Sequence, residues 1–447
     1  MVEPKNLKAA LMKTGLLIFL AVVFICIGNA PGNPSRPAYY VDDQGTLRMS
    51  VDDTEASFFG VNYTMPFAHA YRAADYLGFD RKEAIDRDVY HFARLGFNAY
   101  RIHIWDVEIS DARGNLLDND HLDLLDYLIY RLDERGIKVM LTAMTNFGNG
   151  YPERNQPTGG FSYLYDKCAV HSDPAAVEAQ KRYIAALASH TNPYTGYAYK
   201  DDPCVVAFEI NNEPCHASSP EQTEDYINGM LDALAGTGNL KPVFYNVSHN
   251  MEHVGAYYNT GIDGTTYQWY PIGLVSGYTR KGNFLPYVDS YDIPFSNIPG
   301  FDSKAKAVYE FDPADIMYSY MYPAMARTFR SAGFQWITQF AYDPMDMAAW
   351  NTEYQTHYLN LAYTPGKAVS MKIAAEAAYS IPLHEEFAAY PADTLFGDFR
   401  VSYRDDLSEM NTVKKFFYSN TTSTVPLDAR GLESVAGCGS SPVVRYG

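Results

Sequence analysis

Apolar residues along the chain alternate between two spacings, one typical of strands and one typical of helices. Within 81–95 they recur every three or four positions, Gly96 then ends the helix, and 97–104 follows as an apolar strand. The same order of helix, glycine and strand recurs at 122–143 and at 312–340. This repeat predicts an α/β fold built from successive strand–helix units.

Counting from residue 57, the pattern predicts eight strands. They are centred near residues 58, 99, 139, 207, 245, 267, 308 and 337. A last helix is expected over 366–380. Eight such units predict a (β/α)8 TIM barrel over 57–380. A doubly wound sheet would show a glycine-rich phosphate loop after its first strand, but Gly60 is isolated there.

The two ends of the chain differ in character from the predicted barrel. Residues 1–30 combine basic residues with an apolar run of about a dozen positions, which is typical of an export signal peptide. Residues 31–56 are interpreted as a tether and lead-in strand. Residues 381–447 predict a small C-terminal β extension, which either packs as an edge or begins a longer β domain.

Cysteine usage fits an exported protein only loosely. Cys26 raises the alternative of a lipid anchor, although the bulky residues before it argue against one. The remaining four are too few for a disulfide framework, and their spacing does not suggest zinc. One alternative is that all four are free buried thiols. The other is that Cys168 and Cys215 form a disulfide between two loops.

Composition excludes some partners. With 35 basic and 53 acidic residues the formal net charge is −18, which argues against binding nucleic acid. Beyond the signal, no apolar stretch of about 18 residues predicts an integral membrane segment. The 38 tyrosines suit a wet, ring-stacking surface, although many must line the edge of the core.

Two glutamates lie where a barrel places its reactive groups, at the ends of strands. Glu213 follows the strand 205–210, and Glu310 ends the strand 306–310. Each alone can be explained as an acid at the start of a helix. Together, two facing carboxyls are what the cleavage of a glycosidic bond requires.

The segments AFEINNEP and VYEFD resemble the clan of retaining (β/α)8 glycoside hydrolases, with the closest similarity to family 5 and its cellulase and mannanase members. The resemblance covers 57–380. It implies that Glu213 is the acid/base, that Glu310 is the nucleophile, and that Asn212 holds the 2-hydroxyl of the sugar.

Further positions match this family with two departures. The resemblance implies that Arg101 and Tyr270 support the nucleophile and that Trp336 forms the floor of the sugar site. Gln268 stands where the family has a histidine two residues before the tyrosine. The histidine expected after the third strand is also missing, because residues 145–147 are Thr-Asn-Phe.

Several other residues follow predicted strands. Trp105, Trp269 and Trp350 either stack on sugars or are buried in the core. His249 and Asn250, after the fifth strand, are candidates for sugar contact.

The sequence therefore predicts an exported hydrolase of β-glycosidic bonds that works by double displacement on an oligo- or polysaccharide. A β-mannoside or β-glucoside substrate is implied by the resemblance alone. No cofactor or metal is expected, since neither an HExxH motif nor paired histidines occur at strand ends. The alternatives are a non-catalytic glycan-binding barrel and an exo-acting relative of the β-galactosidase type.

Overall fold

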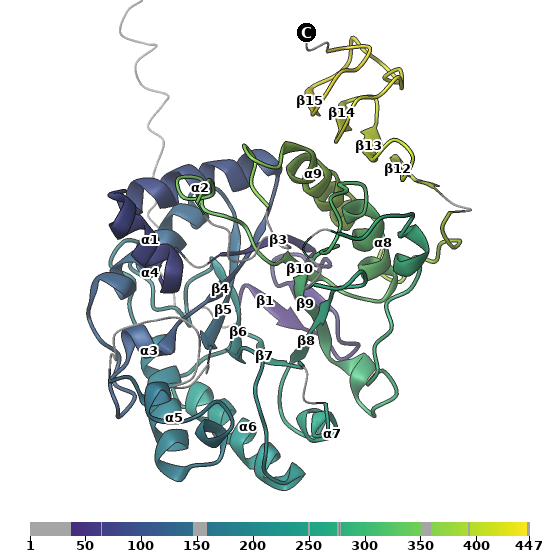
Figure 1. Ribbon diagram of the computed structural model, residues 1–447. Coiled ribbons are helices and arrows are strands. Elements are labelled where there is room, and N and C mark those ends of the chain that lie inside the picture. The colour runs from purple at the N-terminus through teal and green to yellow at the C-terminus, as the bar shows by residue number, and fades with distance from the viewer. Residues whose placement is uncertain are drawn as a thin grey trace, which may run out of the picture. The chain divides into compact units, whose positions relative to one another are not determined.

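A closed barrel of eight parallel strands forms the centre of the protein (Figure 1). The computed structural model describes residues 37–63, 65–145, 159–248, 251–274, 277, 279–350, 359–391 and 394–444. In chain order, the barrel strands are β3 (Phe58–Tyr63), β4 (Ala99–His103), β5 (Lys138–Met144), β6 (Val205–Asn211), β7 (Val243–Asn246), β8 (Gly264–Trp269), β9 (Ala305–Phe311) and β10 (Trp336–Gln339). β10 pairs with both β9 and β3, which closes the ring. The predicted barrel and the positions of its eight strands are confirmed.

Helices surround this ring in Figure 1. The α-helices of the described residues are α1 (Ala68–Leu77), α2 (Arg81–Leu95), α3 (Asp106–Ile109), α4 (Asp120–Asp133), α5 (Pro174–Ser189), α6 (Pro220–Ala235), α7 (Val254–Tyr258), α8 (Tyr322–Ser331) and α9 (Pro365–Ser380). Short 3-10 turns are η2 (Phe161–Leu164), η3 (Ala169–His171), η4 (Leu285–Val288) and η5 (Phe301–Ser303). As the sequence predicts, α2 ends at Gly96, whose φ of 78° is left-handed and easily adopted by glycine.

The N-terminal end of the barrel is filled with apolar side chains and covered by a hairpin. The hairpin strands β1 (Tyr39–Val41) and β2 (Leu47–Met49) are antiparallel. Leu47 packs into the interior cluster that contains Phe58 and Trp336. The Gln335 side chain fixes the hairpin by bonding the backbone nitrogen of Leu47 at 2.7 Å and its oxygen at 2.8 Å. This end of the barrel is therefore closed, which leaves the C-terminal end for chemistry.

A small sheet follows the barrel, as predicted for the C-terminal β element. Its strands are β11 (Leu395–Phe396), β12 (Phe399–Ser402), β13 (Leu407–Asn411), β14 (Lys415–Tyr418) and β15 (Ser434–Gly437). The first four pair antiparallel, and β15 joins β14 in parallel. The sheet packs on α9, where the hydroxyls of Ser370 and Ser408 lie 2.7 Å apart and Lys415 pairs with Glu376.

Several predictions fall on residues that the structure does not describe. These are the signal peptide at 1–30 with Cys26, and the sugar-contact candidates His249 and Asn250. Within the described ranges, none of the helices combines the length and apolar character that a membrane crossing needs.

Candidate active site

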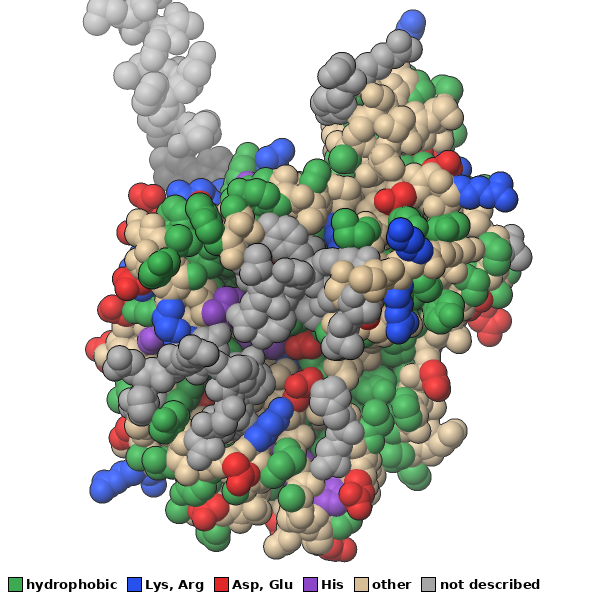
Figure 2. All heavy atoms as spheres, in the orientation of Figure 1, with side chains coloured by type: hydrophobic (Ala, Val, Ile, Leu, Met, Phe, Trp, Pro, Cys, Tyr) green, Lys and Arg blue, Asp and Glu red, His purple; other side chains and the backbone are tan. Residues whose placement is uncertain are grey.

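The carboxyl groups of Glu213 and Glu310 lie at the C-terminal end of the barrel, each beside a tyrosine. The Tyr270 hydroxyl donates to Glu310 Oε2 at 2.9 Å. The Tyr309 hydroxyl, next along the chain to Glu310, donates to Glu213 Oε1 at 3.0 Å. Figure 2 shows acidic, basic and histidine side chains gathered near the centre of this face. The structure thus brings the two predicted carboxyls into one site.

Glu213 has an unusual backbone conformation. Its φ of 47° lies in the left-handed region, which few residues other than glycine adopt. Its backbone N–H donates to the side chain of Asn246 at 3.2 Å, which helps to hold this conformation. Such outliers persist where the surroundings enforce them, and they concentrate at functional sites.

The surroundings of Glu310 shift its pKa. Burial, and after it the negative charge of Glu213, raise the pKa of Glu310 above its usual range. The charge of Arg101 and the hydrogen bond from Tyr270 act in the opposite direction. The raised pKa belongs to Glu310, so Arg101 and Tyr270 are the groups that favour the ionised form that a nucleophile requires.

A layer of polar side chains supports the site from inside the barrel. Glu209, fully buried on β6, is the centre of this layer. Arg101 Nε donates to Glu209 Oε2 at 2.8 Å. Further donors to this carboxylate are the Thr142 hydroxyl at 2.6 Å, the Thr266 hydroxyl at 2.5 Å and the Asn246 amide at 3.0 Å. With both oxygens bonded, the buried charge of Glu209 is compensated.

Arg101 was expected to support the nucleophile directly, and the structure gives it a different set of partners. Its guanidinium bonds Glu209 and His103, and it donates to Asn212 Oδ1 at 2.9 Å. It reaches Glu310 through its charge, which lowers the pKa of that carboxyl. Arg101 therefore fixes Asn212 beside Glu213. The predicted contact between Asn212 and a sugar stays a prediction.

Trp336 is not at the floor of the site, and this prediction is wrong. It is the first residue of β10, fully buried in the apolar cluster at the N-terminal end of the barrel. Its ring lies against Phe58, with centroids 4.9 Å apart. At the other end of the strand, Phe340 faces His103 with near-parallel rings 6.0 Å apart. On this strand the aromatic residue on the side of the site is thus Phe340, because Trp336 begins β10 and Phe340 follows its end.

Trp269 also points away from the site. Successive residues of a strand face opposite sides, and Gln268 faces the interior, where its Oε1 lies 3.1 Å from the Tyr309 hydroxyl. Trp269 therefore lies outside the barrel, packed against Tyr291 and Phe329. The expectation that Trp269 stacks on sugar is corrected for this reason.

The other two tryptophans differ in exposure. Trp105 follows β4 but is only 6% exposed within the core, which leaves little surface for a sugar. Trp350 is 62% exposed and near Phe79, so its ring is accessible.

His103, Tyr309 and Glu209 are parts of the site that the sequence analysis left without a role. His103 Nε2 lies 3.9 Å from Glu310 Oε1, and burial and Arg101 hold the pKa of this histidine well below its usual value. It is therefore neutral. A signal did exist for Glu209 and Tyr309, since each is a polar residue within an apolar strand, but the sequence does not show their partners.

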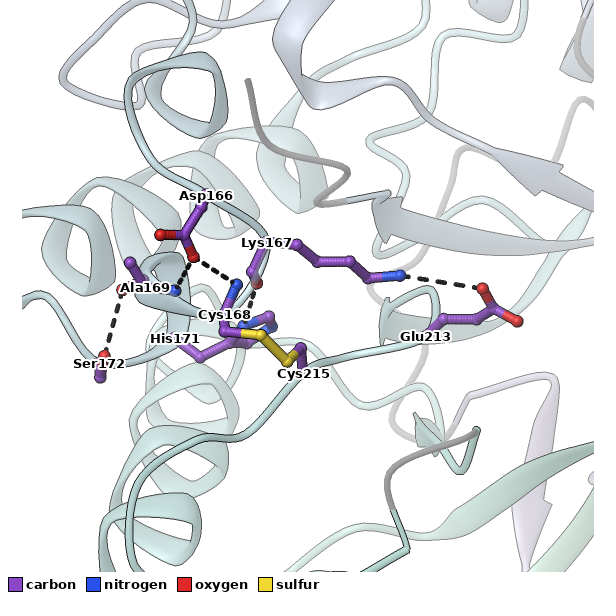
Figure 3. The surroundings of a disulfide bond; sticks show 8 residues. All are labelled: Asp166, Lys167, Cys168, Ala169, His171, Ser172, Glu213 and Cys215. Atoms are coloured by element: carbon purple, nitrogen blue, oxygen red, sulfur yellow. Dashed lines mark hydrogen bonds and ion pairs between the residues drawn. A yellow bond between two sulfur atoms is a disulfide. The ribbon is translucent and has the colours of Figure 1, made fainter. Parts of the chain in front are cut away.

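A disulfide joins Cys168 to Cys215 beside the site (Figure 3). The sequence left open whether these two cysteines pair, and in the structure they form a disulfide bond. Cys204 and Cys438 are free. The residue before Cys168 is Lys167, whose ammonium lies 3.9 Å from Glu213 Oε2.

These groups suit acid and nucleophilic chemistry on a bond placed between two carboxyls. Among the described residues, no group of three or more His, Cys, Asp and Glu side chains is arranged to hold a metal ion. The arrangement contains a carboxyl that can give a proton, a second that can attack, and tyrosine donors to each.

Comparison with known proteins points in the same direction. No family model matches the chain. The putative mannan endo-1,4-β-mannosidase 5 of Oryza sativa subsp. japonica is 42% identical over 120 residues, which are 26% of this chain and 24% of the relative. The mannan endo-1,4-β-mannosidase 2 of Arabidopsis thaliana is 27% identical over 151 residues, 32% of each chain. The chain resembles the family 5 mannanases. It spans about a quarter to a third of the curated relatives it matches.

This protein has the same fold as solved structures of a mannanase and a mannosidase. The endo-1,4-β-mannanase of Rhizomucor miehei superposes with a TM-score of 0.57 at 16% identity, covering 76% of this chain and 99% of that one. The exo-β-1,4-mannosidase of Opitutaceae bacterium strain TAV5 has a TM-score of 0.52 at 19% identity, covering 76% and 63%. At such identities the likeness establishes the (β/α)8 fold.

Proposed function

We propose that the protein hydrolyses β-1,4-mannosidic bonds with retention of configuration. The observation that carries the proposal is the pair of carboxyls, Glu213 and Glu310, brought from β6 and β9 into one site and bonded to Tyr309 and Tyr270. The choice of mannoside over glucoside rests on the mannosidases among the relatives.

In the first step, ionised Glu310 attacks the anomeric carbon and forms a glycosyl ester. Glu213 gives its proton to the leaving oxygen as the glycosidic bond breaks. Tyr270 holds the attacking carboxylate through its hydrogen bond to Oε2. In the second step Glu213 takes a proton from water, which attacks the ester and releases the sugar.

Internal cleavage of mannan is our preferred mode, because the curated relatives carry that activity in their names. Removal of single units from chain ends is the second candidate, since an exo-β-1,4-mannosidase shares the fold. The size of the first products from mannohexaose separates the two modes.

We also propose that the protein acts outside the cytoplasm. The basic and apolar pattern of residues 1–30 supports this, and so does the Cys168–Cys215 disulfide, because such bonds persist in oxidising compartments. Fractionation of cells that express the full chain tests it.

The decisive assay offers mannohexaose, cellohexaose, galactomannan and an aryl β-galactoside to the wild-type protein and to Glu310→Gln. We expect turnover of the mannosides by the wild type alone, with the β-anomer as the first product in NMR spectra. Turnover of only cellohexaose or the galactoside would reassign the substrate. Binding of every glycan without turnover would instead support a glycan-binding barrel.

A further inference from the structure

Lys167 is the basic side chain that reaches the proposed acid/base from the loop side. Its Nζ lies 3.9 Å from Glu213 Oε2, and Figure 3 shows the lysine chain extended toward that carboxyl. The other oxygen of Glu213 bonds Tyr309. The two side chains are 31% and 18% exposed, so water screens this pair only partly.

A covalent link joins the segment that contains Lys167 to the segment that contains Glu213. Lys167 precedes Cys168, and Cys215 lies two residues after Glu213. The disulfide joins these cysteines with their Cα atoms 4.7 Å apart. The path from the lysine to the glutamate therefore runs through five residues and one S–S bond, although the cysteines are 47 positions apart in sequence.

Hydrogen bonds hold the same loop in a second way. Asp166 Oδ1 accepts from the backbone N–H groups of Cys168 at 3.0 Å and Ala169 at 2.8 Å. His171 Nδ1 lies 3.0 Å from the Lys167 carbonyl oxygen, which can only accept, so Nδ1 carries the proton. Its Nε2 then accepts from Asn211 at 3.3 Å, at the end of β6. Burial lowers the pKa of His171 to about 4, so this neutral tautomer persists at neutral pH.

We propose that Lys167, clamped by the Cys168–Cys215 disulfide, balances the negative charge that Glu213 acquires when it protonates the leaving oxygen. This rests on the function proposed above. In that step the bond from Glu310 to the anomeric carbon forms, the glycosidic bond breaks, and the proton passes from Glu213 to the leaving oxygen. Glu213 is left as a carboxylate beside the ammonium group.

The electrostatics of the site agree with this role. Burial lowers the pKa of Lys167, and the charges of Glu213 and Glu310 act in the opposite direction, so the lysine interacts with both carboxyls. Arg101 is engaged with Glu209. Lys167 is thus placed to compensate a charge that moves between the two catalytic groups.

The test uses aryl β-mannobiosides whose leaving groups range from 2,4-dinitrophenol, which needs no protonation, to phenol, which does. We expect Lys167→Met to lower kcat/KM about tenfold on the phenyl substrate and less than about twofold on the dinitrophenyl one. Lys167→Arg should restore most of the loss. Lys181→Met, which removes a surface partner of Glu178, is the matched control and should behave as wild type.

The double variant Cys168→Ser/Cys215→Ser tests the clamp. It should reproduce the leaving-group dependence of Lys167→Met while its circular dichroism shows a folded barrel. A uniform loss across the series in Lys167→Met would refute the role of the lysine, and a wild-type pattern in the cysteine variant would refute the clamp. A wild type inactive on every substrate in the series would refute the proposed function instead.

Discussion

The two ends of the barrel interior are built from the same strands but contain opposite kinds of side chain. On four of the strands, a buried apolar residue near the N-terminal end is followed two positions later by a buried polar one. The pairs are Ala99 and Arg101, Ala207 and Glu209, Phe244 and Asn246, and Trp336 and Thr338. The N-terminal end thus forms a hydrophobic plug, and the C-terminal end forms a network around a buried ion pair.

The apolar end of the barrel mainly stabilises the fold, and the polar end mainly serves the reaction. The plug stabilises the fold by removing apolar surface from water. The network contains charges that cost free energy to bury and are tolerated only because each has partners. Changes in the plug should therefore alter the free energy of unfolding alone, whereas changes in the network should alter both unfolding and turnover.

The largest expected effect is on turnover. Glu310→Gln should lower kcat by about 10⁴-fold or more, because the amide cannot form the glycosyl ester. Steady-state kinetics on mannohexaose measures this. Residual activity within about tenfold of wild type would remove Glu310 from the mechanism.

Breaking the ion pair comes next. Arg101→Met leaves Glu209 charged and buried and should reduce the free energy of unfolding by about 3–5 kcal/mol. It should also lower kcat, since Arg101 positions Asn212. Urea unfolding gives the stability change, and a Glu209→Gln/Arg101→Met double variant should recover part of it.

The plug supplies the contrasting case. Trp336→Leu should reduce the free energy of unfolding by about 2 kcal/mol through lost burial, with kcat unchanged within about twofold. The same urea and kinetic measurements apply. A selective loss of mannohexaose binding in this variant would contradict the position of Trp336 at the closed end.

The smallest effect depends on pH. Folding raises the pKa of Glu310. This group therefore favours the folded state at a pH below its unfolded pKa, and the contribution is lost as the pH rises through its folded pKa. Glu310→Gln removes this dependence. The stability that the variant gains over wild type should therefore grow as the pH rises from about 4 to 8, which urea unfolding at a series of pH values measures.

Much of the barrel was predictable because its signals are local. The spacing of apolar residues and a glycine at the end of a helix identified the strands, and the position of Glu213 and Glu310 at strand ends identified the carboxyl pair. Trp336 was misassigned because the sequence centres this strand near residue 337, whereas β10 begins at Trp336 and places it in the apolar cluster at the closed end. The prediction for Trp269 depended on which side of β8 this residue faces. The contact between Gln268 and Tyr309 decides this, and the sequence does not show that contact.

Lys167 shows the limit of such signals. It lies in a long loop without periodicity, and the disulfide that brings it to Glu213 joins residues far apart in sequence. Partners of the buried Glu209 come from β4, β5, β7 and β8, so they become visible only in three dimensions.

α9 is covered on two sides, and this has a consequence for how the protein can be shortened. One side packs on the barrel and the other on the C-terminal sheet, so residues such as Val369, Met371 and Ile373 and all five alanines of the helix are buried. A version cut after residue 380 would present these apolar side chains to water and should aggregate. The smallest portable unit for engineering therefore includes the sheet as well as the barrel.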